Sequence, residues 1–323
     1  MAGLLYEVDK QSVFLCEAPM FDVIGLVSSV QPVLYNGGQL VISDGFIPDR
    51  TLDRLSDPKL GITHYFCIPQ MSNALRQVES FDPQRLQSLK ALLTGGAPHP
   101  EVQIRRWLKD GIAIVDGYGM SEAGTIFGMP HQIDLLDKKA GCVGFNAPRL
   151  AVRLCDGNGH EVEPGQPGEV QLKGDNLFIA YWRKESVFNS SFTADGWFET
   201  GDIAVQDAEG YYRIVDRKKD MFISGGENVY PAEVEGIVLK HPDIKECAMI
   251  GIPNEKWGEV GCLYVVAHAQ NAQLDTLLLV EYLTGQLAKY KLPKQVVVLD
   301  ALPRTSSGKV LKHVLLANAV KSA

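Results

Sequence analysis

Up to about residue 115 the chain alternates short apolar runs with segments of helical spacing. Gln39–Ser43, Ile62–Pro69 and Ile112–Val115 are typical of short buried strands. Asp82–Leu93 and Pro100–Lys109 carry apolar residues at helical intervals and are expected to be helices. This alternation favours an α/β arrangement in which helices cover a partly parallel sheet.

Two further patterns follow this α/β portion. From about residue 141 to 216, short apolar runs are separated by Gly, Pro, Asp and Asn, as in DGNGHEVEPGQPGEV, which favours a small antiparallel, barrel-like β unit. Beyond residue 217, Pro231 suits the first turn of a helix, and strand-like and helix-like segments continue to the C-terminus. The predicted fold is therefore an incomplete layered α/β portion over residues 1–216, with the β unit at about 141–216, followed by a hinged, compact α+β domain over residues 217–323.

Composition and charge exclude several classes of protein. The chain has 323 residues, 46% of them hydrophobic and 22% charged, which is typical of a two-domain globular protein. Its net charge of −8 argues against general nucleic-acid binding, and no apolar run approaches the length of a transmembrane segment. The six scattered cysteines form no CxxC pair, so free thiols in a reducing compartment are expected. The start MAGLLYEVDKQ is unlike a secretory signal and the final Lys-Ser-Ala is unlike a peroxisomal address, so we expect a cytoplasmic location.

The segment DGYGMSE, residues 116–122, has the composition of a nucleotide site. It follows the apolar strand IAIV, and Tyr118 offers a flat face for a purine ring. Ser121 can donate a hydrogen bond to a phosphate oxygen, and Glu122 offers the hard oxygen ligand that Mg²⁺ prefers. A surface turn in which the glycines only reverse the chain is the alternative interpretation.

Three other segments allow a functional and a plain structural interpretation. In TGGAP, residues 94–98, glycines would let a ligand approach the backbone, or they form a simple turn. In DGWFETGD, Asp202 would accept hydrogen bonds from a ribose diol, and the same segment also suits a hairpin turn. DRKKD, residues 216–220, is either a solvated charge run or a hinge between the β unit and the last domain.

Lys309 follows Ser307-Gly308 in the segment PRTSSGKVLK. A phosphate-binding P-loop is excluded because the required upstream glycine is Pro303 and Val310 replaces the hydroxyl residue after the lysine. A lysine on such a loop can neutralise developing negative charge, although a solvated surface lysine is the commoner case. The seven histidines show no metal-ligand spacing, and no GxSxG motif occurs.

Taken in order, these signals resemble the adenylate-forming (AMP-binding) superfamily of the acyl-CoA synthetase type. The resemblance covers essentially the whole chain and rests on these matching elements: Pro19-Met20-Phe21, the Gly-Gly-Ala-Pro turn, Asp116–Glu122, Gly168-Glu169-Val170 with Gly174, Tyr181-Trp182, Asp202, Arg217, Lys219, Ser224–Pro231 and Lys309.

The resemblance implies an enzyme that uses ATP, Mg²⁺ and coenzyme A. A carboxylic acid would attack ATP to form an acyl-adenylate, and a thiol would take the acyl group after the C-terminal domain swings about a hinge. It implies Lys309 as the catalytic residue, Glu122 as the Mg²⁺ ligand and Lys219 as the hinge. The implied nucleotide-binding residues are Gly96, Ala97, Pro98, Asp116, Gly117, Tyr118, Gly119, Ser121, Asp202 and Arg217, and those for coenzyme A are Ser224, Gly225 and Gly226.

The chain departs from the family pattern in two respects. Phe21 is followed by Asp22 where the family usually has histidine, which affects the shape of the acyl pocket. Nothing in the chain resembles the Ser/Thr/Gly-rich phosphate loop that the family carries upstream. The chain thus resembles the family without its N-terminal part, and we expect exposed strand edges or a requirement for a partner such as a complementing N-terminal fragment.

Three functions are therefore compatible with the residues. The first is an acyl-CoA ligase, with a fatty or medium-chain acid preferred because Phe21–Val30 is apolar. The second is an adenylating enzyme that loads a carrier protein in a biosynthetic pathway. The third is a non-catalytic protein that binds nucleotide or acyl-adenylate.

Overall fold

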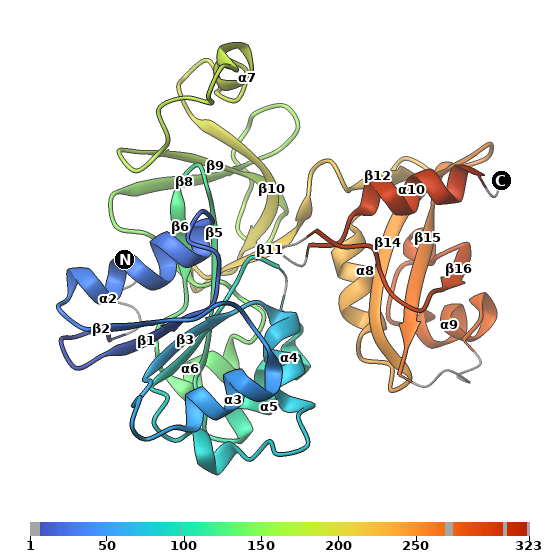
Figure 1. Cartoon of the computed structure of the whole chain (residues 1–323). Coiled ribbons are helices and arrows are strands. Elements are labelled where there is room, and N and C mark those ends of the chain that lie inside the picture. The colour runs from blue at the N-terminus through green and yellow to red at the C-terminus, as the bar shows by residue number, and fades with distance from the viewer. Residues whose placement is uncertain (1–6, 98, 269–273, 306–308, 322–323) are drawn as a thin grey trace. The chain divides into compact units, whose positions relative to one another are not determined.

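The computed structural model describes residues 7–97, 99–268, 274–305 and 309–321, and its contacts divide the chain into two compact units. The N-terminal unit comprises residues 1–200 and 204–214, and the C-terminal unit comprises residues 201–203 and 215–323. The division runs through two neighbouring strands, β10 (Phe198–Gln206) and β11 (Tyr212–Arg217). Figure 1 shows the elements of each unit.

The N-terminal unit contains a seven-stranded sheet whose first five strands in chain order are parallel. The strand order is β2-β1-β3-β4-β5-β6-β7, and β6 and β7 are joined by antiparallel pairing. The strands are β1 (Val13–Cys16), β2 (Gln39–Ile42), β3 (His64–Cys67), β4 (Ala91–Thr94), β5 (Ile114–Met120), β6 (Gly124–Gly128) and β7 (Phe145–Asn146). The helical segments are η1 (Ile24–Val30), α2 (Gln31–Tyr35), α3 (Pro48–Ser56), α4 (Pro69–Arg76), η2 (Pro83–Leu86), α5 (Glu101–Lys109) and α6 (Ile133–Lys138).

Continuous apolar runs explain why the central strands are buried. The segments VFLC of β1 and ALLT of β4 are buried at every position, as parallel strands covered on both faces require. The α/β architecture predicted from the alternation is thereby confirmed.

The prediction of a helix over Asp82–Leu93 was wrong. Only a short 3₁₀ turn, Pro83–Leu86, forms there, with the Asp82 side chain accepting from the amide of Gln84. Ala91–Thr94 pairs instead with β3 on one side and β5 on the other. The apolar run Ala91–Leu93 fits either period, and the place between two parallel strands decided for a strand.

A second sheet, ordered β11-β10-β9-β8, follows in the chain. Its other strands are β8 (Leu150–Cys155) and β9 (Gly168–Gly174), which pair antiparallel, and the short helix α7 (Glu185–Asn189) precedes β10. Phe178 packs near the aromatic rings of Phe188, Phe192 and Phe198. These ring contacts attach the segment around α7 to the sheet.

The C-terminal unit is an α+β domain. Its sheet follows the order β13-β12-β15-β14, and β16 pairs parallel with β15. The elements are β12 (Phe222–Ser224), β13 (Glu227–Val229), α8 (Pro231–Val238), β14 (Ile244–Asn254), β15 (Gly258–Ala267), α9 (Thr276–Leu283), η3 (Lys289–Lys291), β16 (Gln295–Val298) and α10 (Lys312–Lys321).

Alternating side chains of β14 and β15 divide the core of this unit into two clusters. Met249 and Leu263 pack with Val234 of α8, whereas Ala248 and Cys262 join the cluster that contains Leu315 of α10. Because successive side chains of a strand point to opposite faces, α8 and α10 cover opposite faces of the sheet.

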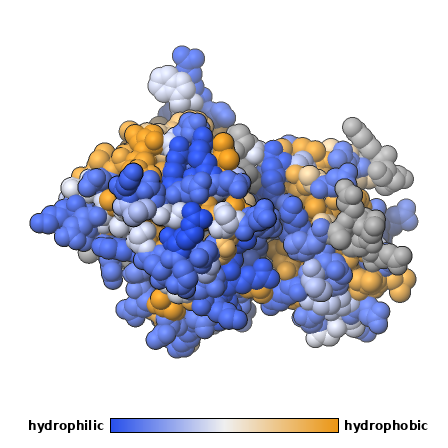
Figure 2. Space-filling model, turned by 60° about the horizontal axis from the view of Figure 1, so that its bottom comes forward, coloured by the Kyte–Doolittle hydropathy of each residue, from blue (hydrophilic) through white to orange (hydrophobic). Residues whose placement is uncertain are grey.

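The edge of the large sheet carries exposed apolar side chains. Strand β2 ends the strand order, and Ile42 on it is 61% exposed. Phe21 and Tyr35, in the preceding segment, are 91% and 92% exposed. Figure 2 shows one face of the molecule, on which hydrophobic patches interrupt a mainly hydrophilic surface. Among the described residues β2 is an edge strand with exposed side chains, in agreement with the expectation of an exposed edge.

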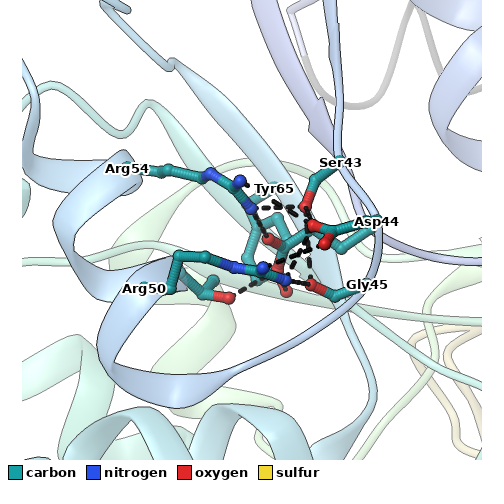
Figure 3. Close-up of polar contacts among 8 residues, drawn as sticks. Ser43, Asp44, Gly45, Arg50, Arg54 and Tyr65 are labelled. Atoms are coloured by element: carbon teal, nitrogen blue, oxygen red, sulfur yellow. Dashed lines mark hydrogen bonds and ion pairs between the residues drawn. The ribbon is translucent and has the colours of Figure 1, made fainter.

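A buried carboxylate joins β1 and β3 to helix α3. Glu17 follows β1, and its side chain accepts hydrogen bonds from Thr51 Oγ1 at 2.6 Å, Tyr65 OH at 2.9 Å and Arg54 at 3.0 Å. Arg54 also contacts Ser43 after β2, and Figure 3 shows Arg50 and Arg54 reaching from α3 toward residues 43–45. A buried ion pair with additional hydrogen-bond partners is costly to break. This network therefore holds the carboxyl ends of β1 and β2 against α3.

All six cysteines are free thiols, as their scattered spacing predicts, and burial raises the pKa of Cys16. No helix within the described ranges is long and apolar enough to cross a membrane.

Candidate functional site

The glycine-rich turn after β4 meets the glycine-containing second half of strand β5. Thr94 pairs with Asp116 in the parallel register of β4 and β5. The turn at Gly95 is packed so tightly that a Cβ there would lie 2.8 Å from the carbonyl oxygen of Gly117. Two predicted segments, residues 94–97 and 116–119, are therefore side by side; Pro98, also predicted here, lies outside the described residues.

Gly96 and Gly119 are exposed on this surface, and Ala97 is half-buried. Gly96 has a φ of 81°, which favours glycine, and a Cβ there would lie 3.1 Å from Ile24 Cδ1. A Cβ on Gly119 would lie 2.4 Å from the carbonyl oxygen of Gly124, so glycine is required for the tight β5–β6 hairpin. The first turn of η1 thus lies next to the glycine turn after β4.

The ring of Tyr118 is the first of three aromatic rings that stack in series. Its ring centroid is 5.7 Å from that of Phe127, and Phe127 stacks on Tyr212 at 4.3 Å. Tyr118 itself is half-buried. Stacked rings of this kind can present a rigid flat surface to a planar ligand.

Asp116 is buried, whereas the other residues of the motif, 117–122, are half-buried or exposed. Its side chain accepts a hydrogen bond from the amide of Gly117 at 2.9 Å, and burial raises the pKa of its carboxyl to about 8. A carboxyl in this state is largely protonated at neutral pH and can donate a hydrogen bond.

Ser121 and Glu122 form the turn of the β5–β6 hairpin. The hydroxyl of Tyr181 donates to Glu122 Oε1 at 2.9 Å, and the amide of Phe178 donates to the Glu122 carbonyl at 2.8 Å. Burial and the Glu122 carboxylate raise the pKa of Tyr181 to about 12, so the phenol stays a donor. Tyr181 belonged to the matching elements, but its action on Glu122 was not predicted.

The donor set at Glu122 fits a magnesium ion that shares phosphate ligands. The side chain is half-buried, and Tyr181 engages only one of its two oxygens. Within the described ranges no three His, Cys, Asp or Glu side chains converge as a metal site. A single carboxylate with ligand phosphates is a usual arrangement for Mg²⁺.

The C-terminal unit brings Asp202 and Arg217 together. Arg217 Nε lies 3.1 Å from Asp202 Oδ1; the Asp202 side chain is 6% exposed and that of Arg217 is 50% exposed. The amide of Lys218 donates to the carbonyl of Gly201 at 2.8 Å. Lys219 is exposed on the following turn, residues 218–220.

Ser224, Gly225 and Gly226 form the turn between β12 and β13. Gly225 has a φ of 63° and Gly226 a φ of 89°, and the amide of Gly225 donates to the carbonyl of Trp257 at 2.8 Å. A Cβ on Gly225 would lie 2.9 Å from the Trp257 ring, over which Lys256 Nζ lies 5.0 Å from the centroid. Sequence reasoning missed Trp257 as a neighbour of this turn, because the contact joins distant segments.

Lys309 lies in the C-terminal unit, whereas Tyr118 and Glu122 lie in the N-terminal unit. It is exposed, and its carbonyl accepts from the amide of Thr305 at 2.9 Å. Ser307 and Gly308 lie outside the described residues.

These features define a class of protein. An open, mainly parallel α/β sheet with a glycine-rich segment beyond the carboxyl ends of its strands is the architecture in which nucleotides bind at the strand ends. The chain belongs to the AMP-binding enzyme family: the family model matches residues 2–182, and the model of the family's C-terminal domain matches residues 233–309. The predicted family is thereby confirmed.

Relatives of known activity and solved structures agree with this assignment. A feruloyl-CoA synthase from an Amycolatopsis species is 38% identical over 301 residues, which are 92% of this chain and 60% of the relative. A long-chain fatty acid–CoA ligase from Mycobacterium tuberculosis is 37% identical over 304 residues, 93% of this chain and 58% of the relative. The crystal structure of ATP-bound MatB from Rhodopseudomonas palustris is 31% identical in sequence, with a TM-score of 0.91. The match covers 98% of this chain and 62% of the MatB chain. The chain thus spans about 60% of the length of the curated relatives it matches.

Proposed function

We propose that this chain carries the activity of an ATP-dependent acid–thiol ligase of the acyl-CoA synthetase type. The observation that carries the proposal is the glycine turn after β4 packed against Gly117 beside Tyr118, with Glu122 held by Tyr181, in a chain of the AMP-binding enzyme family. A carboxylate oxygen attacks the α-phosphorus of ATP, and the bond to the leaving pyrophosphate breaks. The thiol sulfur of coenzyme A then attacks the acyl carbon, AMP leaves and the thiol proton passes to solvent.

Residues of the N-terminal unit hold the nucleotide in this proposal. The purine stacks on Tyr118, and the backbone at Gly96, Ala97 and Gly119 allows its close approach. Ser121 donates to the α-phosphate. Mg²⁺, when bound at Glu122, neutralises part of the phosphate charge.

Residues of the C-terminal unit supply the remaining roles. Asp202 and Arg217 are already paired with each other. The Asp202 carboxylate accepts hydrogen bonds from the ribose hydroxyls, and the Arg217 guanidinium donates to them. Lys219 is the hinge, Lys309 neutralises the charge that develops on the reacting oxygens, and the Ser224–Gly226 turn with Trp257 receives the pantetheine arm.

The substrate proposed is an apolar carboxylic acid, fatty or medium-chain. The η1 segment IGLVSSV supports this choice because Ile24 lies beside Gly96 and Val27 beside Gly124. The relatives include both an aryl-CoA and a fatty acyl-CoA enzyme, so aromatic acids are the natural comparison.

A complementing polypeptide is proposed for full activity. The exposed apolar side chains near β2 and the 60% share of the relatives' length support a further segment that covers this edge. Transfer to a carrier protein and a cytoplasmic location stay predictions.

The proposed function is tested with ATP, Mg²⁺, coenzyme A and a panel of fatty and aromatic acids. Pyrophosphate release is measured by a coupled assay and acyl-CoA by mass spectrometry, for the chain alone and with the N-terminal region of a relative added in trans. If the folded protein yields neither product in either form, the ligase assignment is rejected. Calorimetric binding of an acyl-sulfamoyl adenosine without turnover would then identify a non-catalytic binding protein.

Replacing Tyr181 by phenylalanine is expected to weaken the binding of Mg·ATP by about ten- to a hundredfold, because a hydrogen bond to a carboxylate contributes roughly 1.5–3 kcal/mol. Binding is measured by calorimetry with and without Mg²⁺, and Tyr35→Phe, at a position 92% exposed, is the control. The same loss for ATP alone would contradict a role of Tyr181 in orienting the metal ligand.

A further inference from the structure

Lys312 forms an ion pair across β14, the edge strand of the C-terminal sheet. Its ammonium lies 2.8 Å from Glu235 Oε1, and the two side chains are only 20% and 18% exposed. Lys312 is the first residue of α10 and Glu235 lies on α8, and these helices cover opposite faces of the sheet. Since β14 ends the sheet and both helices contact it, the pair joins the two layers at this edge.

The same carboxylate also satisfies the backbone of the edge strand. Glu235 Oε1 accepts a hydrogen bond from the amide of Met249 in β14 at 2.7 Å. The carbonyl of Glu235 accepts from Cys247 Sγ at 3.6 Å. Glu235 is therefore held in place independently of Lys312 and gives the ammonium a rigid partner.

A second carboxylate, buried near the end of β11 and hydrogen-bonded to the first turn of α8, lies within electrostatic range of this ion pair. Asp216 is 7% exposed and accepts from the amides of Arg217 at 2.7 Å and Ala232 at 2.8 Å. Burial raises the pKa of Asp216 to about 6, and the positive charge of Lys312 opposes that rise. Burial by itself would lower the pKa of Lys312, but the carboxylates of Glu235, Asp216 and Asp220 raise it.

Lys312 thus lies between the segment that carries Lys309 and the segment that carries the predicted hinge. On one side, the turn that carries Lys309 is closed by the bridge between Arg304 and Val310 and by the hydrogen bond from Leu311 N to Pro303 O at 2.8 Å. Lys312 follows this turn directly. On the other side, Asp216 directly precedes the segment Arg217–Asp220 that contains the predicted hinge.

We propose that Lys312 is a positioning residue that fastens the Lys309-bearing turn to helix α8 and to the strand end before the predicted hinge. The catalytic meaning of this link rests on the proposed function of Lys309, whereas the link itself is a property of the C-terminal unit. Removing the ammonium would leave the half-buried Glu235 carboxylate without its ion-pair partner and the buried Asp216 without a nearby positive charge, which loosens both segments.

The link is tested by hydrogen exchange and mass spectrometry on the full chain, which requires no activity. Lys312→Met is expected to speed the exchange of the Thr305 and Leu311 amides and of the Lys218 and Met221 amides by about tenfold, as for the loss of a partly screened ion pair. Lys312→Arg restores slow exchange. Lys291→Met, which breaks the Lys291–Glu233 pair of 2.7 Å on the same helix α8, leaves all four amides unchanged.

Faster exchange confined to Thr305, Leu311 and α10, with the amides of Lys218 and Met221 unaltered, would overturn the proposal in favour of a local role at the helix start. If Lys312→Met unfolds the domain, the double variant Lys312→Met with Glu235→Gln removes the unpaired charge and is measured instead. Wild-type exchange at all four amides in that double variant would also overturn it. An inactive chain that shows the expected exchange pattern refutes the proposed function and leaves this inference standing.

Discussion

Replacing Lys309 by alanine is expected to lower the rate of acyl-adenylate formation by about 10²–10³-fold, because a single preorganised charge donor to a developing anion contributes on this scale. Transfer of the acyl group from a supplied acyl-adenylate to coenzyme A should change far less. The two steps are measured separately, as pyrophosphate release in the first and acyl-CoA formation in the second.

A lysine elsewhere in the same unit provides the matched control. Lys245 is exposed on β14, and Lys245→Ala removes the same charge from the chain without altering either step. Equal losses in both steps for Lys309→Ala would contradict the assigned role, since a residue confined to adenylate formation has no reason to affect thioester transfer.

Asp116→Asn is expected to stabilise the protein at neutral and alkaline pH. Burial raises the pKa of Asp116 from 3.8 to about 8. The favourable contribution of the neutral acid to the free energy of unfolding is therefore complete below pH 3.8 and is lost as the pH rises toward 8. The amide mimics the neutral acid at every pH. With ~1.4 kcal/mol for each pH unit between the two pKa values, the gain in unfolding free energy is on the order of 4 kcal/mol at pH 7 and approaches zero near pH 4.

This prediction is measured by urea unfolding of both proteins at several pH values. Asp195→Asn is a control of opposite sign, because Arg153 and Thr193 hold the pKa of Asp195 at about 2. The stability that Asp195 contributes is present above pH 3.8 and is lost as the pH falls through 2, so its removal destabilises at neutral pH. A gain for Asp116→Asn that is independent of pH would contradict a buried, protonated carboxyl at this position.

Several parts of this molecule follow from local sequence patterns. Uninterrupted apolar runs predicted β3 and the strand at the start of β5, and Pro231 marked the beginning of α8. The order of the motifs identified the family and named the glycine turns after β4 and β12. These features depend on residues that are close in the chain, where side-chain period and backbone preference act directly.

Only the tertiary structure decided the contacts that hold these motifs. Tyr181 reaches Glu122 across 59 residues and Lys312 reaches Glu235 across 77, and no local pattern marks such partners. The segment Ala91–Leu93 has a spacing compatible with a helix, yet it is a strand because two parallel neighbours supply its hydrogen bonds. The sequence by itself determined which side chains the protein has for its chemistry and in what order. Their orientation and protonation came from packing, since burial and hydrogen-bond partners arise between segments that only the fold brings together.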